Sequence, residues 1–232
     1  MPSSAEEELA ARLRTAGCVF AEDEAALLLA GGTGPDLERL VHRRVAGEPL
    51  EHLLGWAGFC GLRVEVGPGV FVPRARTALL AEQAVAAARR TGTGSPVVVD
   101  LCCGSGAVAA VVAAAVPGAE LHAADLAPVA VRVARRNLPG AAVHEGDLYA
   151  ALPVALRRRV DVLVANPPHV PSAAVALMPP EAREHEPLDA LDGGPDGREV
   201  LDRIVWEASA WLAPAGLLLV EAGRDQAPAV ME

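Results

Sequence analysis

The feature that most constrains the fold of this chain is a regular alternation of short apolar runs and helix-length segments. The apolar runs, which predict strands, lie at 97–101, 120–125, 141–145, 160–165 and 216–221. Helices are expected between them at 105–116, 127–138 and 198–212, with a weak helical segment near 149–158. Alternation of this length predicts an α/β fold, built on a doubly wound, mostly parallel sheet with right-handed crossovers.

A glycine-containing turn follows the first expected strand. Gly104 and Gly106 lack a Cβ, so a ligand could approach this backbone closely. The helix expected from about Ser105 would direct its free N–H groups and its positive dipole end at that ligand. Asp125 ends the second strand, where a carboxylate can accept both hydroxyls of a ribose. Together these residues predict a nucleotide-type site at the carboxyl end of the sheet.

The tetrapeptide Asn166-Pro167-Pro168-His169 follows the strand at 160–165. The two prolines end the strand and fix the backbone, because each restricts its own φ and the first also restricts the residue before it. The Asn166 side chain is therefore held where open α/β sheets bind their ligands. Its oxygen and the Pro167 carbonyl could each accept a hydrogen bond from one planar NH2 group. Taken alone, the motif could also be a simple turn.

A further acid, Asp147, follows the third expected strand. The glycine-containing turn, Asp125, Asp147 and Asn-Pro-Pro, in this order, resemble the pattern of the class I S-adenosylmethionine-dependent methyltransferases, which have a Rossmann-like fold. Three flanking segments narrow the resemblance to the N5-glutamine methyltransferases that act on peptide-chain release factors, the HemK/PrmC type. These segments are 47–55, 71–77 and 186–197, which contain Gly-Glu-Pro-Leu-Glu-His-Leu-Leu-Gly, Phe-Val-Pro-Arg with Thr77, and a pair of glycines after Glu-Pro. The resemblance extends from about residue 45 to the end and identifies the chain as a divergent member of this family.

This resemblance implies S-adenosyl-L-methionine as the cofactor and S-adenosyl-L-homocysteine as its product. The implied cofactor-binding residues are Asp100, Cys102, Cys103, Gly104, Ser105, Gly106, Asp125, Leu126, Asp147, Leu148 and Asn166. Asp125 would bind the ribose and could also cap the helix at 127–138. Asp147 would meet the adenine amino group, and Leu148 would pack on the ring. Asp100 could hold the turn by accepting backbone N–H groups, or could meet the methionine amino group, and we favour the first role.

The implied catalytic residues are Asn166, Pro167, Pro168 and His169. The implied substrate is a protein that exposes a glutamine, such as a peptide-chain release factor. His169 stands where the family has tyrosine, and it could stack on the substrate amide or act as a general base. We favour stacking, because an amide nitrogen needs orientation more than deprotonation.

Other departures from the family pattern also concern the expected site. Cys102 replaces the first glycine of the turn, and Arg76 and Ala78 replace the glutamates on either side of the family's threonine. These departures suggest that the substrate could differ from a release factor. They also leave open a cofactor-binding protein without activity.

The chain is expected to have three parts. Residues 1–46 would form a small helical subdomain, and residues 47–74 a linker that contains a β-hairpin. In the subdomain, helices are expected at 4–16, 22–31 and 36–46. The first of them would begin with a capping box of Ser4 and Glu7.

The third part, residues 75–232, would be the S-adenosylmethionine-binding domain. It contains a long loop at 170–197, and a loop of this length is often a lid. The sequence ends soon after the strand at 216–221, so this domain is expected to lack the last strands of the fold. The strand at 216–221 would then lie at an exposed edge.

Composition excludes several classes of function. The net charge of −10 argues against an extended phosphate-binding surface, which disfavours an adenine or cytosine amino methyltransferase acting on nucleic acid. The acidic amino terminus is unlike a signal peptide, and no apolar stretch is long enough to span a bilayer. We therefore expect a cytoplasmic protein with no membrane partner. The cysteines and histidines lack metal-ligand spacing, so no metal site is expected.

Overall fold

A five-stranded parallel sheet forms the centre of the molecule in a computed structural model, which describes residues 3–92 and 94–230. Its strands are β3 (Val97–Leu101), β4 (Glu120–Asp125), β5 (Ala142–Glu145), β6 (Val160–Ala165) and β7 (Leu212–Val220). Their order is β5-β4-β3-β6-β7, so the winding direction reverses between β3 and β6. The predicted doubly wound sheet is confirmed, and the carboxyl ends of β3 and β6 border the crevice where such sheets bind ligands.

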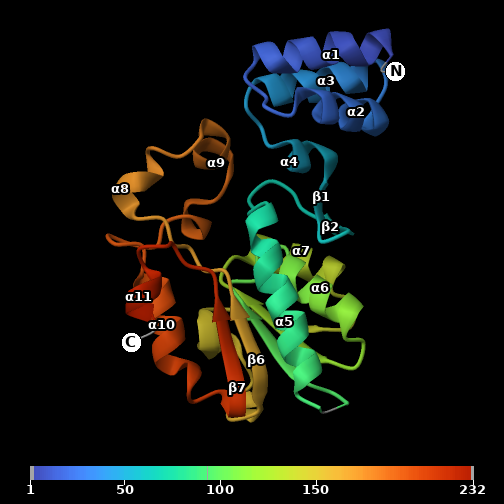
Figure 1. The fold of residues 1–232 in the computed structure, drawn as a ribbon. Coiled ribbons are helices and arrows are strands. Elements are labelled where there is room, and N and C mark those ends of the chain that lie inside the picture. The colour runs from blue at the N-terminus through green and yellow to red at the C-terminus, as the bar shows by residue number, and fades with distance from the viewer. Residues whose placement is uncertain (1–2, 93, 231–232) are drawn as a thin grey trace.

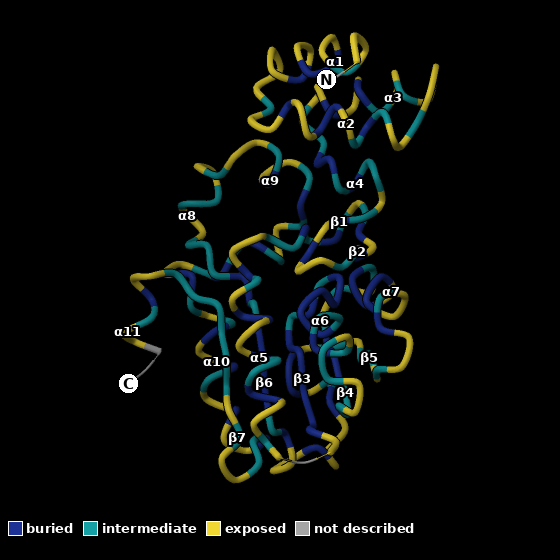
Figure 2. The backbone as a smooth tube through the Cα atoms, turned by 45° about the vertical axis from the view of Figure 1, so that its right-hand side comes forward, coloured by how far each residue is buried: buried dark blue, intermediate teal, exposed yellow. Residues whose placement is uncertain are grey.

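Helices cover both faces of this sheet (Figure 1). On one face lie α5 (Ala78–Arg90), preceded by the 3₁₀ turn η1 (Ala75–Thr77), α6 (Ala107–Ala115) and α7 (Pro128–Asn137). On the other face lie α10 (Glu199–Ala208) and the 3₁₀ turns η2 (Leu148–Ala151) and η3 (Val154–Leu156). Val98 and Val164 pack with α5 and α6, whereas Val99 and Leu163 pack with Ile204 of α10. Both faces of the central strands are thus buried, as the runs of valine predict (Figure 2).

A layer of helices lies beyond the carboxyl end of the sheet, at the top of Figure 1. It contains α1 (Ser4–Thr15), α2 (Ala21–Gly31) and α3 (Gly34–Val45), which bury a core of their own around Leu13, Leu28 and Val41. The short helix α4 (Leu50–Leu54) and the antiparallel hairpin of β1 (Trp56–Phe59) and β2 (Leu62–Glu65) connect this layer to the sheet. The capping box of α1 uses Ser3 and Glu6, so the prediction of Ser4 and Glu7 is wrong by one residue.

The segment at 170–197, expected to be a loop, contains two short helices and a 3₁₀ turn. These are α8 (Ser172–Val175), α9 (Pro180–His185) and η4 (Leu188–Ala190). The segment lies beside the carboxyl ends of the strands, with α9 facing the helical layer (Figure 1). The last short helix of the chain is α11 (Ala227–Val230). Helices of one or two turns are too short to produce an apolar period in the sequence, which explains why the pattern indicated a loop.

Two further expectations differ from the structure. The weak helix near 149–158 is a pair of 3₁₀ turns, η2 and η3, and Pro153 lies between them. β7 begins at Leu212 rather than at 216, because Leu212 already pairs with Val160. A register shift follows this pair, and within it Ala215 has a φ of 65°. β7 lies at one edge of the sheet, as expected. Among the described residues, no helix is long and apolar enough to cross a membrane.

Candidate active site at the carboxyl end of the sheet

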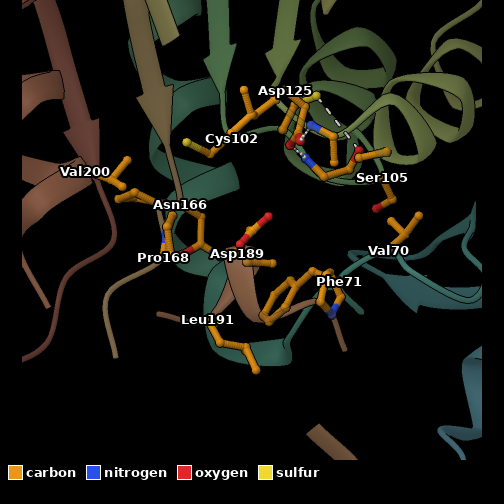
Figure 3. A pocket seen from close by; sticks show the side chains of 18 of the residues that line it. Val70, Phe71, Cys102, Ser105, Asp125, Asn166, Pro168, Asp189, Leu191 and Val200 are labelled. Carbon is orange, nitrogen blue, oxygen red and sulfur yellow. Dashed lines mark hydrogen bonds between the residues drawn. The ribbon is translucent and has the colours of Figure 1, made fainter. Parts of the chain in front are cut away.

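A cavity of about 410 Å³ lies at the carboxyl ends of β3, β4 and β6. Of the sequence-predicted site residues, the cavity is lined by Asp100, Cys102, Cys103, Gly104, Ser105, Asp125, Leu126, Asp147, Leu148, Asn166, Pro167, Pro168 and His169. Gly106 is the exception. It precedes α6 with a φ of 77°, and a Cβ there would lie 2.8 Å from Leu138 Cδ1, so its role is close helix packing. Figure 3 shows Asp125 and Ser105 on one side of the cavity and Asn166 on the other.

Asp125 holds the glycine turn. Its carboxylate accepts hydrogen bonds from the backbone N–H groups of Gly104 at 2.8 Å and Ala127 at 2.9 Å. The prediction that it caps the following helix is wrong, because the N-cap of α7 is Ala127, which Asp125 supports from outside the helix. Burial raises the pKa of Asp125, and the backbone N–H donors oppose this rise. The carboxylate is thus fixed at the cavity wall with lone pairs left for a ligand.

Asp100 is buried beneath the turn. It accepts a hydrogen bond from the N–H of Ala109 in α6 at 3.2 Å, so it fixes the helix, while Asp125 fixes the turn. The expectation that Asp100 holds the turn itself is therefore corrected. Burial raises the pKa of Asp100 to about 7, and the nearby Asp125 adds to the rise. A cation in this cavity would favour the ionised form of Asp100.

Cys102 stands in the turn where a glycine would be less strained. Its φ of 54° lies in the left-handed region, which costs a residue with a Cβ roughly 1–2 kcal/mol. Burial raises the pKa of both the Cys102 and Cys103 thiols, so neither is a thiolate near neutral pH. All four cysteines are free, and the described residues contain no group of His, Cys, Asp and Glu that could hold a metal ion.

Asp147 lies at the third acidic position of the site, after β5. One of its oxygens accepts a hydrogen bond from Arg203 Nη2 of α10 at 2.6 Å. The next residue, Leu148, is buried and has a φ of 46°. One carboxylate oxygen and the Leu148 side chain thus remain at the cavity wall.

Asn166 is one of the residues with a buried polar side-chain atom that lacks a hydrogen-bond partner among the described residues. In Asn166 this atom is Oδ1. Beside it, His169 Nδ1 lies 2.9 Å from the Pro167 carbonyl oxygen. A carbonyl can only accept, so Nδ1 carries the hydrogen and the other ring nitrogen, Nε2, is an acceptor when the ring is neutral. A carbonyl oxygen has two lone pairs, so Pro167 can accept one further hydrogen bond.

Comparison with known proteins agrees with this geometry. Residues 63–179 match the family model "Methyltransferase small domain". A release factor glutamine methyltransferase of Bradyrhizobium diazoefficiens is 36% identical over 97% of this chain and 83% of its own length. The chain belongs to the release factor glutamine methyltransferase family.

Other relatives differ in the acceptor that their names state. The release factor glutamine methyltransferase of Streptomyces coelicolor is 41% identical over 78% of this chain. A 4-amino-L-phenylalanine/4-methylamino-L-phenylalanine methyltransferase of Streptomyces pristinaespiralis is 38% identical over 92% of this chain and 74% of its own length. The chain spans 65% of the length of the Streptomyces coelicolor relative. The fold is also similar to that of a methyltransferase from Pyrococcus furiosus, with a TM-score of 0.50 at 17% identity, covering 74% of this chain and 75% of that one.

In this member of the release factor glutamine methyltransferase family, partly buried ion pairs hold the segment at 170–197 beside the site. Arg44 of α3 pairs with Glu24 and also donates to Glu181 Oε2 in α9 at 3.0 Å. Glu186 accepts hydrogen bonds from Arg74 Nη2 at 2.6 Å and from the backbone N–H of Val72 at 3.1 Å. Burial raises the pKa of Glu186, and Arg74 opposes the rise. The segment is therefore fastened to both the helical layer and the linker.

Several residues that line the cavity were not predicted from the sequence. Arg203 and Val200 come from α10, and Asp189 comes from η4. All three follow the Asn-Pro-Pro motif in sequence and reach the cavity only because the chain returns across the sheet. No local pattern distinguishes them from ordinary surface residues. Arg76, noted only as a departure from the family, also lines the cavity.

Proposed function

We propose that this protein is an S-adenosylmethionine-dependent methyltransferase that methylates the side-chain amide nitrogen of glutamine in a protein such as a release factor. The observation that carries this proposal is the buried Oδ1 of Asn166, which has no partner among the described residues, at a cavity lined by four acidic residues. A buried acceptor without a donor is costly, and the NH2 group of an amide would relieve that cost. The names of the relatives support glutamine as the methylated residue.

We assign the cofactor to the half of the cavity that lies over β3, β4 and β5. Asp125 would accept the ribose hydroxyls, Asp147 the adenine amino group, and Leu148 would pack on the adenine. Asp100 would act from beneath, through the helix that it fixes and through its charge. S-adenosylmethionine supplies an electrophilic methyl group when bound. The donor set fits it, because carboxylates complement hydroxyls, an amino group and a positive charge.

The role of Asn166 and Pro167 would be to orient the acceptor nitrogen. Asn166 Oδ1 and the Pro167 carbonyl would each accept one hydrogen of its NH2 group, which turns the nitrogen lone pair toward the methyl group. Orientation of this kind can contribute on the order of 7–11 kcal/mol. These hydrogen bonds strengthen as positive charge develops on nitrogen, so they stabilise the transition state more than the ground state. Pro168 would fix the loop, and His169 would lie flat against the acceptor.

The three-part division of the chain is also a proposal. Residues 1–46 and 47–74 would recognise the protein substrate and position it, and residues 75–232 would perform the transfer. A cytoplasmic location belongs to the same proposal, because translation proteins are its expected substrates.

A second acceptor is favoured by one observation. The relative whose name states 4-amino-L-phenylalanine matches 92% of this chain. An aromatic amine is also a planar NH2 group, so Asn166 and the Pro167 carbonyl could orient it in the same way.

Labelled S-adenosylmethionine tests the proposed function. The full chain is incubated with the labelled cofactor and either a release factor that contains its glutamine or the same protein with that glutamine replaced. We expect label only in the first protein. Whole-cell lysate serves as a further acceptor, and label there that disappears after nuclease treatment would instead support a nucleic-acid methyltransferase. Cofactor binding without transfer to any acceptor would contradict catalysis.

A further inference from the structure

A second cavity, of about 460 Å³, adjoins the first at the end of β7. Arg76 and His169 line both cavities, and Glu221 lines the second. The N–H of Glu221 donates to the carbonyl of Ala165 at 3.0 Å, so Glu221 and Asn166 follow neighbouring parallel strands. Such strands lie about 4.8 Å apart, a distance comparable to the length of an amino-acid side chain. A molecule whose nitrogen is held by Asn166 could therefore extend to Glu221.

The Glu221 carboxylate is only half satisfied. Its Oε1 accepts a hydrogen bond from Arg76 Nε at 3.1 Å. Its Oε2 is buried and has no partner within the part of the chain that the structure describes. A buried carboxylate oxygen needs a donor, and a charged donor such as an ammonium group forms the strongest hydrogen bond.

Arg76 differs from the other arginines of the first cavity in which of its nitrogens are used. Of the arginines that line the first cavity, Arg74 donates through Nη2 to Glu186, and Arg203 donates through Nη2 to Asp147. Arg76 uses only its Nε, and 68% of its side chain is exposed. Neither of its terminal nitrogens has a partner among the described residues. A guanidinium group with a free edge is suited to bind a carboxylate through two parallel hydrogen bonds.

We propose that Arg76 and Glu221 bind the α-carboxylate and the α-amino group of a free amino acid whose side-chain nitrogen reaches Asn166. This inference rests on the proposed function, because it requires methyl transfer at Asn166. The hydrogen bond between Arg76 and Glu221 fixes the spacing of the two charges. A glutamine inside a protein offers only neutral main-chain groups here, whereas a free amino acid offers one charge of each sign. The subsite thus adds a zwitterionic acceptor to the protein acceptor.

Two matched pairs of acceptors test this subsite. One pair is L-glutamine and N-acetyl-L-glutamine amide, and the other is 4-amino-L-phenylalanine and its N-acetyl amide. Within a pair the reacting nitrogen is the same, and only the charges at the α-carbon differ. Formation of S-adenosylhomocysteine by the full chain gives kcat/KM for each compound. In the pair that the enzyme accepts, we expect the charged member to be favoured at least about tenfold, the scale of one charged hydrogen bond.

Variants assign this preference to the two residues. Arg76→Ala and Glu221→Gln should each bring the ratio within a pair toward one. Arg159→Ala is the matched control, because Arg159 is also exposed and paired with a glutamate, Glu120, but lies at the opposite end of the sheet. This control should keep the ratio of the unchanged protein. Melting temperatures check the folding of all three variants, and calorimetry with the free amino acid and S-adenosylhomocysteine measures binding if a variant is inactive.

The outcomes separate this inference from the proposed function. The subsite would be overturned if the enzyme used the N-acetyl amide as well as or better than the free amino acid in both pairs. It would also be overturned if a release factor were methylated and none of the four small acceptors was. An unchanged preference in Arg76→Ala and Glu221→Gln would also overturn it. If the cofactor binds but no acceptor of any kind is methylated, the proposed function itself fails.

Discussion

The two halves of the cavity differ in how far their polar groups are satisfied. On the side of β3 and β4, Asp100 and Asp125 accept hydrogen bonds from Ala109, Gly104 and Ala127, so the backbone is fixed before any ligand arrives. On the side of β6 and β7, Asn166 Oδ1 in this cavity and Glu221 Oε2 in the adjoining one are buried and have no donor among the described residues. The first half is preorganised, and the second half is completed only by what binds there. The difference teaches that cofactor binding and acceptor recognition can be disrupted separately.

The largest expected effect is on the rate of methyl transfer and comes from a substitution at Asn166, in the half of the cavity next to β6. Asn166→Ala should lower kcat by on the order of 10²–10³, the scale for removing one transition-state hydrogen-bonding group, while cofactor affinity stays within a few-fold. Initial rates and calorimetry measure the two quantities. Asn166→Asp, which keeps an acceptor oxygen, should lose less activity. Turnover of Asn166→Ala at the rate of the unchanged protein would end the proposed role of this residue.

A substitution in the half of the cavity at β3 and β4 should instead weaken cofactor binding. Asp125→Ala should weaken cofactor binding by roughly 1.5–3 kcal/mol, because it removes a charged acceptor and also frees the turn. Asp161→Ala is a suitable control, since Asp161 also accepts a backbone hydrogen bond, from Val97 at 2.8 Å, but at the other end of the sheet. That control should change stability and leave affinity alone. Calorimetry that finds unchanged affinity in folded Asp125→Ala would remove Asp125 from the site.

A smaller effect concerns the proton on Asp100. Its pKa of about 7 in the folded protein lies above the ordinary value of 3.8, so the folded state holds a proton that the unfolded chain has lost. The contribution of Asp100 to the free energy of unfolding therefore falls as pH rises from about 4 to about 7. A cationic ligand favours the ionised form, so cofactor binding near pH 6.5 should release part of a proton.

Calorimetry in two buffers of different ionisation enthalpy measures this proton release. The observed heat should depend on the buffer for the unchanged protein and should lose that dependence in Asp100→Asn. Identical heats in both buffers for the unchanged protein would show that Asp100 keeps its proton state on binding.

The smallest effect is expected at His169. If the imidazole only supplies a flat face, His169→Tyr should keep activity within a few-fold or raise it, and the rate should vary little between pH 6 and 8. A general base would give a rate that climbs over this range and a nearly inactive tyrosine variant. A well-folded, inactive His169→Tyr with intact cofactor binding would contradict stacking and would indicate an acceptor unlike an amide.

The sequence predicted the strand–helix pattern well because the relevant signals are local. The valine run of β3, the acid at the end of β4 and the prolines after β6 each act within a few residues. The resemblance to a known family then placed these signals around one site. The boundaries of β3, β4 and β6 agree with the predicted ranges.

The sequence did not predict what depends on contacts between distant residues. The ion pairs of Asp147 with Arg203 and of Arg76 with Glu221 join residues 56 and 145 positions apart. Asp100 fixes α6 and Asp125 fixes the turn because of how β3 and β4 lie beside each other, and the spacing of residues along the chain does not reveal this arrangement. Likewise, the short helices of 170–197 are held by the groups that surround them rather than by their own apolar pattern.

The position of Arg44 has a consequence for regulation. Because one guanidinium group binds both Glu24 in the helical layer and Glu181 in α9, the two elements share one source of stability. A protein that binds the helical layer and shifts α3 would also change the stability of α9 and of the segment at 170–197 that contains it, part of which lines the cavity. Linkage requires the reverse as well, so a ligand that stabilises this segment would alter the affinity for that protein by the same factor. Hydrogen exchange of α9 amides in Arg44→Met measures the strength of this coupling, and unchanged exchange would mean that the two elements are energetically independent.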